Sequence, residues 1–155
     1  MAASPDSDIM LELARDYDAP VDLVFRVFFD ADALKFIWST ATYTIDHMTV
    51  DAQVGGGWRL AMRDIATRAV ARCTARFTEI EQPKRIVWYE KWLDGPLAGA
   101  RDTRVTLQFE PVAHGTRVKL THEFFPDRRT RDQHVEGWAS GLERLARHLA
   151  PEPVK

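Results

Sequence analysis

Two neighbouring runs of the sequence, residues 103–110 and 116–124, alternate strictly between apolar and polar residues, and this feature constrains the fold most. The apolar series are Val105, Leu107 and Phe109 in the first run, and Val118, Leu120, His122 and Phe124 in the second. A period of two puts alternate side chains on opposite faces of a strand, so each strand has one buried face. The turn residues His114 and Gly115 between the runs therefore predict an antiparallel hairpin.

Similar strand-like runs occur earlier in the chain and are separated by turn residues. They cover residues 8–13, 45–51, 58–62, 71–80 and 86–93. The glycines of "VGGG" supply the backbone angles of a turn after the second run, and Pro83 separates the fourth run from the fifth. Short turns between strands predict one antiparallel sheet of about six to seven strands.

Helical spacing occurs in two places. Two short helices are expected after the first strand. The first is indicated by the helical spacing of Val21, Val24, Phe25 and Phe28. The second carries Leu34 and Ile37, and Asp30 can cap its start. A longer helix is expected from near Arg131 to Leu149, ended by Pro151. Its apolar stripe consists of Val135, Trp138, Leu142, Leu145 and Leu149. We expect this stripe to lie across the apolar face of the sheet and to close an apolar cavity.

The length of 155 residues predicts one domain over residues 8–150, with a disordered start at 1–7 and a tail at 151–155. The formal charge of −2 argues against a partner bound through its phosphates, so nucleic acid is not expected. No apolar run approaches the roughly 20 residues that cross a bilayer, so no membrane insertion is expected. The N-terminal residues do not have the pattern of an apolar secretory leader. The sequence contains one cysteine, Cys73, which is expected to be a small buried apolar residue. Together these features predict a cytoplasmic protein.

The titratable residues show no pattern of a metal site or a nucleophilic enzyme. The histidines are His47, His114, His122, His134 and His148, and none of them forms an HxH or HExxH spacing. The "VGGGWR" segment lacks the Lys-Ser/Thr ending of a phosphate loop. The charged "DRRTRD" segment before the long helix is expected to be a solvated loop that helps start it. We therefore expect no metal and no cofactor.

His122 and Glu90 are the candidate acid–base residues. His122 belongs to the apolar series of its strand, so it is either a ligand or proton-transfer group inside the cavity or a core histidine satisfied by a carbonyl or hydroxyl. Glu90 is spaced by two from Trp88 and from Trp92. If these tryptophans face inward, Glu90 does too, and its pKa would then be raised; otherwise this face points to solvent.

Five tryptophans are many for a domain of this size. Most are expected to be core residues, but some could line a pocket for an apolar ligand, since such pockets are mainly apolar and aromatic. The candidate ligand-binding residues are Trp38, Trp58, Met62, Trp88, Glu90, Trp92, Leu107, His122, Trp138 and Leu142.

Three segments carry a resemblance to a known family: "VDAQVGGGWR", "FTEIEQPKRIVWYEKW" and "HVEGWASGLERLARHL". With the order of elements, they resemble the START-like (SRPBCC) superfamily and, within it, the heat-shock-protein-90 ATPase activator homologue family in its short bacterial single-domain form. The resemblance implies an α+β helix-grip fold, in which a curved antiparallel sheet grips the C-terminal helix. Gln53, where the family often has Arg, and Trp38, where a paired Trp is frequent, depart from the pattern.

The function expected from this resemblance is the binding of a small hydrophobic molecule, lipid-like or polyketide-like, between the sheet and the C-terminal helix. A non-catalytic binding protein is favoured over an enzyme, because no catalytic constellation stands out. Two alternatives remain: a polyketide cyclase or aromatase that uses His122 or Glu90 as acid or base, and a co-chaperone that activates a chaperone ATPase. The sequence is also compatible with a homodimer.

Overall fold

The structure is a computed structural model, and it describes residues 9–150; the expected disordered start and tail lie outside this range. The strands are β1 (Leu11–Tyr17), β2 (Tyr43–Val50), β3 (Gly57–Asp64), β4 (Val70–Glu81), β5 (Arg85–Trp92), β6 (Thr103–Val112) and β7 (Gly115–Glu123). The helices are α1 (Val21–Val27), α2 (Ala31–Trp38) and α3 (Arg128–Leu149).

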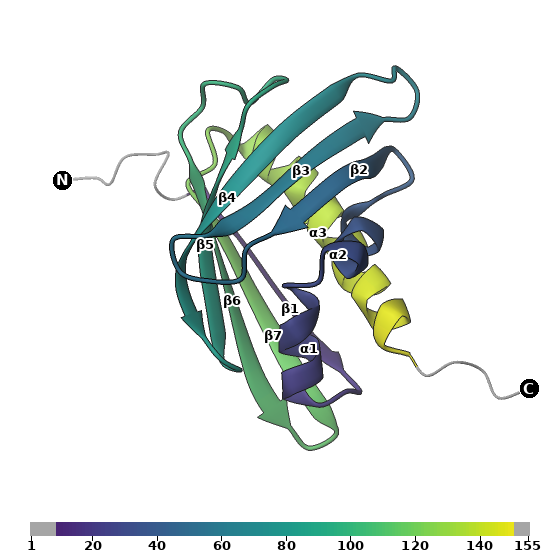
Figure 1. The fold of residues 1–155 in the computed structure, drawn as a ribbon, viewed down its shortest axis with the longest axis vertical. Coiled ribbons are helices and arrows are strands. Elements are labelled where there is room, and N and C mark those ends of the chain that lie inside the picture. Colours follow the sequence, from purple (N-terminus) through teal and green to yellow (C-terminus); the bar gives the residue numbers. More distant parts are fainter. Residues whose placement is uncertain (1–8, 151–155) are drawn as a thin grey trace, which may run out of the picture.

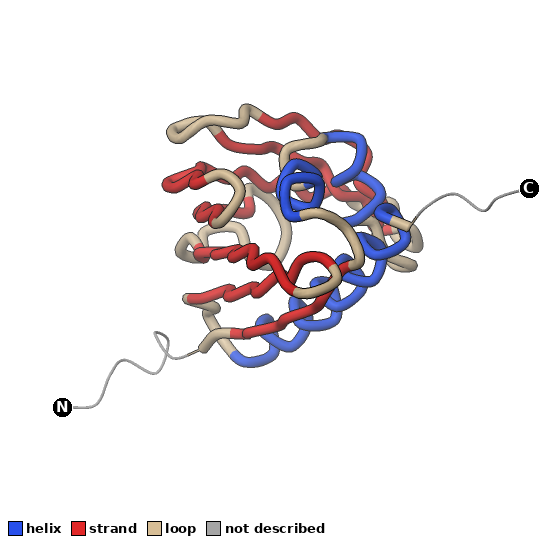
Figure 2. The backbone as a smooth tube through the Cα atoms, turned by 90° about the horizontal axis from the view of Figure 1, so that it is seen from below, coloured by secondary structure: helices blue, strands red, loops and turns tan. Residues whose placement is uncertain are grey.

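The seven strands form one antiparallel sheet in the order β1-β7-β6-β5-β4-β3-β2. The sheet curves, and the three helices lie on its concave side, with α3 running along it (Figures 1 and 2). This arrangement is the helix-grip fold, so the predicted fold class is confirmed. Among the described residues, no helix combines the length and the apolar character needed to cross a membrane.

Alternation positions the inner face of the sheet as the sequence indicated, except at Phe124. This residue follows the end of β7 with a φ angle of 73° and is half-buried, and Phe125 is buried instead. In the β6–β7 hairpin, Leu107 pairs with Leu120 and Val105 pairs with His122, and all four side chains are buried. At the start of β3, Gly57 is required by close packing, because a Cβ atom there would lie only 1.7 Å from the carbonyl oxygen of Ala75 on β4. The strand pattern therefore decides which side chains reach the interior.

The helices begin at side-chain caps. Asp30 accepts a hydrogen bond from the backbone N–H of Ala33 at 3.1 Å and starts α2, as predicted. Asp127 accepts one from the N–H of Thr130 at 2.7 Å and starts α3 at Arg128. The helix thus begins three residues before its expected start, and most of the charged segment predicted to be a loop forms its first turn, because Asp127 rather than a later residue is the cap.

The buried side of α3 closes the core. Trp138, Leu142 and Leu145 are buried against the sheet and against α2, whereas Val135 and Leu149 are half-buried. Burial of one such large apolar side chain contributes about 1.5–3 kcal/mol. The phenol of Tyr17 on the edge strand β1 donates a hydrogen bond to the carbonyl of Leu142 at 2.9 Å. The helix is therefore attached both to the middle of the sheet and to its edge.

Candidate functional site

Four tryptophans meet between the sheet and the helices, and we call them the tryptophan cluster: Trp38, Trp58, Trp88 and Trp138. Trp38 ends α2, Trp58 and Trp88 lie on β3 and β5, and Trp138 lies on α3. The ring centroid of Trp38 lies 5.2 Å from that of Trp58, 6.1 Å from that of Trp88 and 6.1 Å from that of Trp138. These contacts connect α2, the sheet and α3 through aromatic rings, which supply large apolar surface to the interior.

Glu90 lies in the interior beside this cluster. Its side chain is 7% exposed, and one carboxyl oxygen accepts a hydrogen bond from the indole N–H of Trp88 at 2.9 Å. Burial raises the pKa of Glu90 to about 7, because the charged form loses its hydration, and the bond from Trp88 only partly opposes this effect. The carboxyl group can therefore gain or lose a proton near neutral pH.

His122 is fully buried and has partners on both ring nitrogens. The indole N–H of Trp138 donates to Nδ1 at 3.0 Å, and Nε2 lies 2.8 Å from the hydroxyl oxygen of Thr103. Because Nδ1 accepts a hydrogen bond, the ring proton is on Nε2, which donates to Thr103. Burial and the neighbouring His134 lower the pKa of His122, so its ring is neutral.

Thr103 lies between the two candidate acid–base residues. It pairs with Glu90 across β5 and β6, and its hydroxyl is the partner of His122. Thr103 was not among the predicted site residues, although it precedes Val105 in the inward-facing series of β6. Its position as a polar residue in that series was the signal that could have identified it.

A cavity next to Glu90 lies at the end of the interior where α3 begins. It is lined by Glu90, Trp92, Leu97, Ala100, Arg101, Thr103, Phe125, Pro126, Thr130 and His134. Its volume is about 10 Å³, the space of roughly one water molecule. The cavity is too small for the lipid-like or polyketide-like molecule expected from the sequence, because aromatic rings occupy much of the space beneath α3. A larger molecule requires movement of its wall.

The β5–β6 loop, residues 93–102, forms one wall of this cavity. Leu97 and Ala100 line the cavity from the loop, while Gly95 and Gly99 have positive φ angles of 83° and 84°. The loop is attached at both ends: the backbone N–H of Leu93 donates to the carbonyl of Arg72 on β4, and the guanidinium of Arg101 donates to the carbonyl of Phe124. Between these two bonds the loop contains no helix or strand.

The other predicted ligand-binding residues occupy different positions. Leu107 and Leu142 are buried in the core, whereas Met62 and Trp92 are half-buried, and Trp92 lines the cavity. A role for each of them in ligand binding stays a prediction. Cys73 is buried, as expected. Among residues 9–150, no three potential ligands are grouped closely enough to hold a metal ion.

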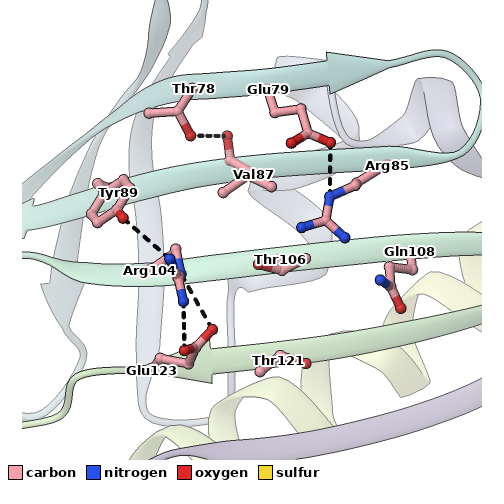
Figure 3. Close-up of a pocket in the computed structure, with 10 residues that line it drawn as sticks. All are labelled: Thr78, Glu79, Arg85, Val87, Tyr89, Arg104, Thr106, Gln108, Thr121 and Glu123. Carbon is pink, nitrogen blue, oxygen red and sulfur yellow. Dashed lines mark hydrogen bonds and ion pairs between the residues drawn. The ribbon is translucent and has the colours of Figure 1, made fainter. Parts of the chain in front are cut away.

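A second hollow, of about 530 Å³, lies on the opposite, outward face of the sheet (Figure 3). Two ion pairs cross it: Arg85 with Glu79 at 2.7 Å, and Arg104 with Glu123 at 2.7 Å. Arg104 also donates to the hydroxyl of Tyr89. These charges balance one another, and none of the predicted site residues lines this hollow, so the inner cavity is the better candidate site.

A curved antiparallel sheet that holds a long C-terminal helix over an aromatic interior defines a helix-grip protein. The chain belongs to the family of Activator of Hsp90 ATPase homolog 1-like proteins, whose family model matches residues 18–150. The sequence resemblance to this family is thereby confirmed.

Solved structures show the same fold. Protein CV1439 from Chromobacterium violaceum is 25% identical, with a TM-score of 0.81 and coverage of 92% of this chain and 99% of that chain. Protein NE0264 from Nitrosomonas europaea is 22% identical, with a TM-score of 0.74 and coverage of 95% and 96%. The AHSA1 protein SPO3351 from Silicibacter pomeroyi is 23% identical, with a TM-score of 0.75 and coverage of 90% and 96%. No curated protein matches the sequence.

Proposed function

We propose that the protein binds a small hydrophobic molecule between the inner face of the sheet and α3. The observation that carries the proposal is the buried carboxyl group of Glu90, which lines a cavity beside aromatic rings. A buried carboxyl group costs free energy unless it has partners, so proteins tend to keep such groups where they act on a ligand or a reaction. Aromatic walls with few polar groups are typical of small-molecule sites.

Aromatic rings bind the apolar part of the ligand, and the polar side chains of Glu90 and Thr103 bind its polar group. The apolar part of the ligand packs on Trp92 and Phe125 and reaches toward the tryptophan cluster, where burial of its surface contributes about 25 cal/mol per Å². Glu90 and the hydroxyl of Thr103 form hydrogen bonds with a polar group of the ligand. Since the pKa of Glu90 is raised to about 7, an uncharged ligand binds more tightly below this pH, where the carboxyl group is neutral.

The ligand enters as the β5–β6 loop moves away from Phe125 and Pro126. This step is needed because the cavity holds about 10 Å³. The affinity measured then includes the free-energy cost of opening.

A screen of lipid-like and polyketide-like molecules by thermal shift, followed by calorimetry, tests the proposal. We expect at least one class to bind the wild type, and we expect Ala100→Trp, which narrows the cavity mouth, to weaken binding by about tenfold or more. Ala98→Trp is the matched control, because Ala98 is exposed in the same loop and does not line the cavity. Absence of binding, or equal loss in both variants, would contradict the proposal.

A second candidate function is proton transfer on a bound polyketide-like molecule, and the raised pKa of Glu90 favours it. A general acid or base works best when its pKa is near the working pH. His122 is less suited to begin such a reaction, because the indole N–H of Trp138 occupies the lone pair of Nδ1. Turnover of a bound ligand that is lost in Glu90→Gln, with binding retained, would distinguish an enzyme from a carrier.

A further inference from the structure

Two indole N–H groups in the tryptophan cluster are buried without a hydrogen-bond partner. They belong to Trp38 and Trp58, and among residues 9–150 they are the buried side-chain polar atoms that lack one. Trp58 is 3% exposed, so solvent does not reach its ring. A buried donor without an acceptor is unfavourable, and it calls for a specific explanation in a folded protein.

The other two members of the cluster provide an internal comparison. Trp88 donates its N–H to Glu90, and Trp138 donates to His122. The same residue type is therefore satisfied on one side of the cluster and unsatisfied on the other. The two unsatisfied rings are in contact, with centroids 5.2 Å apart and planes inclined at 61°. The missing acceptors are thus concentrated in one pair of neighbouring residues.

The surroundings of Trp38 include a position where α3 carries no side chain. A Cβ atom added at Gly141 would lie 3.7 Å from Cδ1 of Trp38, the carbon bonded to its Nε1. At Gly141, α3 therefore contributes no side-chain acceptor and no side-chain bulk beside Trp38. The atom nearest to the added Cβ would be the carbonyl oxygen of Ile37 on α2, at 3.5 Å.

We propose that Trp38 and Trp58 donate hydrogen bonds to an acceptor oxygen of the bound ligand, which is therefore an apolar molecule carrying an uncharged carbonyl group. An indole N–H can only donate, so the complementary group must be an acceptor. A ligand carboxylate fits poorly, because the cluster contains no cationic side chain and a buried unpaired charge is costly. The ligand class is a ketone, ester or quinone with an apolar body. This inference rests on the proposed function.

Matched pairs of probes test the inference. Each pair consists of an aromatic or long-chain ketone and the hydrocarbon of the same shape, for example 2-acetylnaphthalene and 2-isopropenylnaphthalene. Both are titrated into the full chain labelled with ¹⁵N at the indole nitrogens. We expect the ketone to bind about tenfold more tightly, and we expect it to move the Nε1–H proton resonances of Trp38 and Trp58 downfield.

The outcomes separate this inference from the proposed function. Equal affinity for ketone and hydrocarbon, without downfield movement of the two resonances, overturns the inference and leaves the proposed function standing. If no pair binds at all, the inference fails, and the screen of lipid-like and polyketide-like molecules then decides whether the proposed function fails with it. Tighter binding of the ketone with the downfield movement confined to Trp88 or Trp138 also overturns the inference, because a different donor then holds the carbonyl oxygen.

A sulfur isostere of tryptophan, 3-benzothienylalanine, removes the N–H and preserves the shape of the ring. At position 58 it is expected to abolish the advantage of the ketone over the hydrocarbon and to raise the midpoint of thermal unfolding of the free protein. At position 138, the matched control, it is expected to lower that midpoint, because Nδ1 of His122 loses its donor. A lowered midpoint at position 58 would mean that its N–H has an acceptor, such as an ordered water, in the free protein, and it would overturn the inference.

Discussion

Single residues set the electrostatics of the interior. Glu90 and His122 are both buried, but their pKa values move in opposite directions from their ordinary ranges, since burial disfavours the charged form of each. Both groups are therefore uncharged in the folded protein at mildly acidic pH. The result is an interior in which hydrogen bonds, rather than charges, connect the side chains of β6, β7 and α3.

Replacement of Glu90 by Gln should change how stability depends on pH. The folded-state pKa of about 7 exceeds the ordinary value of 4.5, so the folded protein keeps a proton that the unfolded chain releases. The contribution of Glu90 is complete below pH 4.5, and it is lost as the pH rises to about 7, a fall of about 3 kcal/mol.

Urea unfolding of the wild type and of Glu90→Gln at several pH values measures this difference directly. Gln keeps an oxygen that can accept the bond from Trp88, and the contributions of His122 and His134 are common to both proteins. The free energy of unfolding of the variant should therefore rise relative to the wild type across this window. A difference that stays constant with pH would refute the raised pKa.

His122 should remain neutral, with its proton on Nε2, down to the pH at which the protein unfolds. Its lowered pKa means that the unfolded chain takes up a proton first, so the contribution of His122 is present above about pH 6.5 and is lost as the pH falls. The ¹⁵N chemical shifts of the imidazole ring report both the tautomer and the titration. A titration midpoint near 6.5, or a proton on Nδ1, would contradict the hydrogen bond from Trp138.

Secondary-structure elements respond to backbone preferences as well as to contacts. Gly137 lies in α3 and Gly55 lies in the turn before β3, and an added Cβ atom would meet nothing within 4 Å at either position. They differ in backbone conformation, because Gly55 has a φ angle of +88° whereas Gly137 is helical. The same substitution should therefore have opposite effects at the two positions.

Gly137→Ala should raise the free energy of unfolding by about 1 kcal/mol, because alanine is the better helix former. Gly55→Ala should lower it by about 1 kcal/mol, because a side chain is strained at positive φ. Chemical denaturation of both variants checks the pair. If both changes acted in the same direction, backbone conformation would not be the cause.

The molecule as a whole should unfold in one step. The tryptophan cluster includes rings from α2, β3, β5 and α3, so loosening any of these elements removes contacts from the others. Tryptophan fluorescence, which reports the cluster, and far-ultraviolet circular dichroism, which reports the helices and strands, should give the same unfolding midpoint. Separate midpoints would mean that α3 leaves the sheet before the sheet unfolds.

The architecture could be predicted because it rests on local patterns. Alternation in β6 and β7 identified the inner face, the apolar stripe of α3 identified its partner surface, and Asp30 identified the start of α2. The start of α3 was placed too late, since Asp127 and the charged residues after it resembled a loop. Period and composition describe which side of an element is buried, but helix ends depend on individual capping bonds.

The site depended on distances that no local pattern contains. The sequence by itself determined that Glu90 and His122 belong to series containing large apolar residues. Only the tertiary structure decided that Thr103 lies between them, that Trp138 occupies Nδ1 of His122, and that aromatic rings leave a cavity of about 10 Å³. The physical reason is that facing is a property of one strand, whereas hydrogen bonds and packing volume are set jointly by strands and helices far apart in the chain.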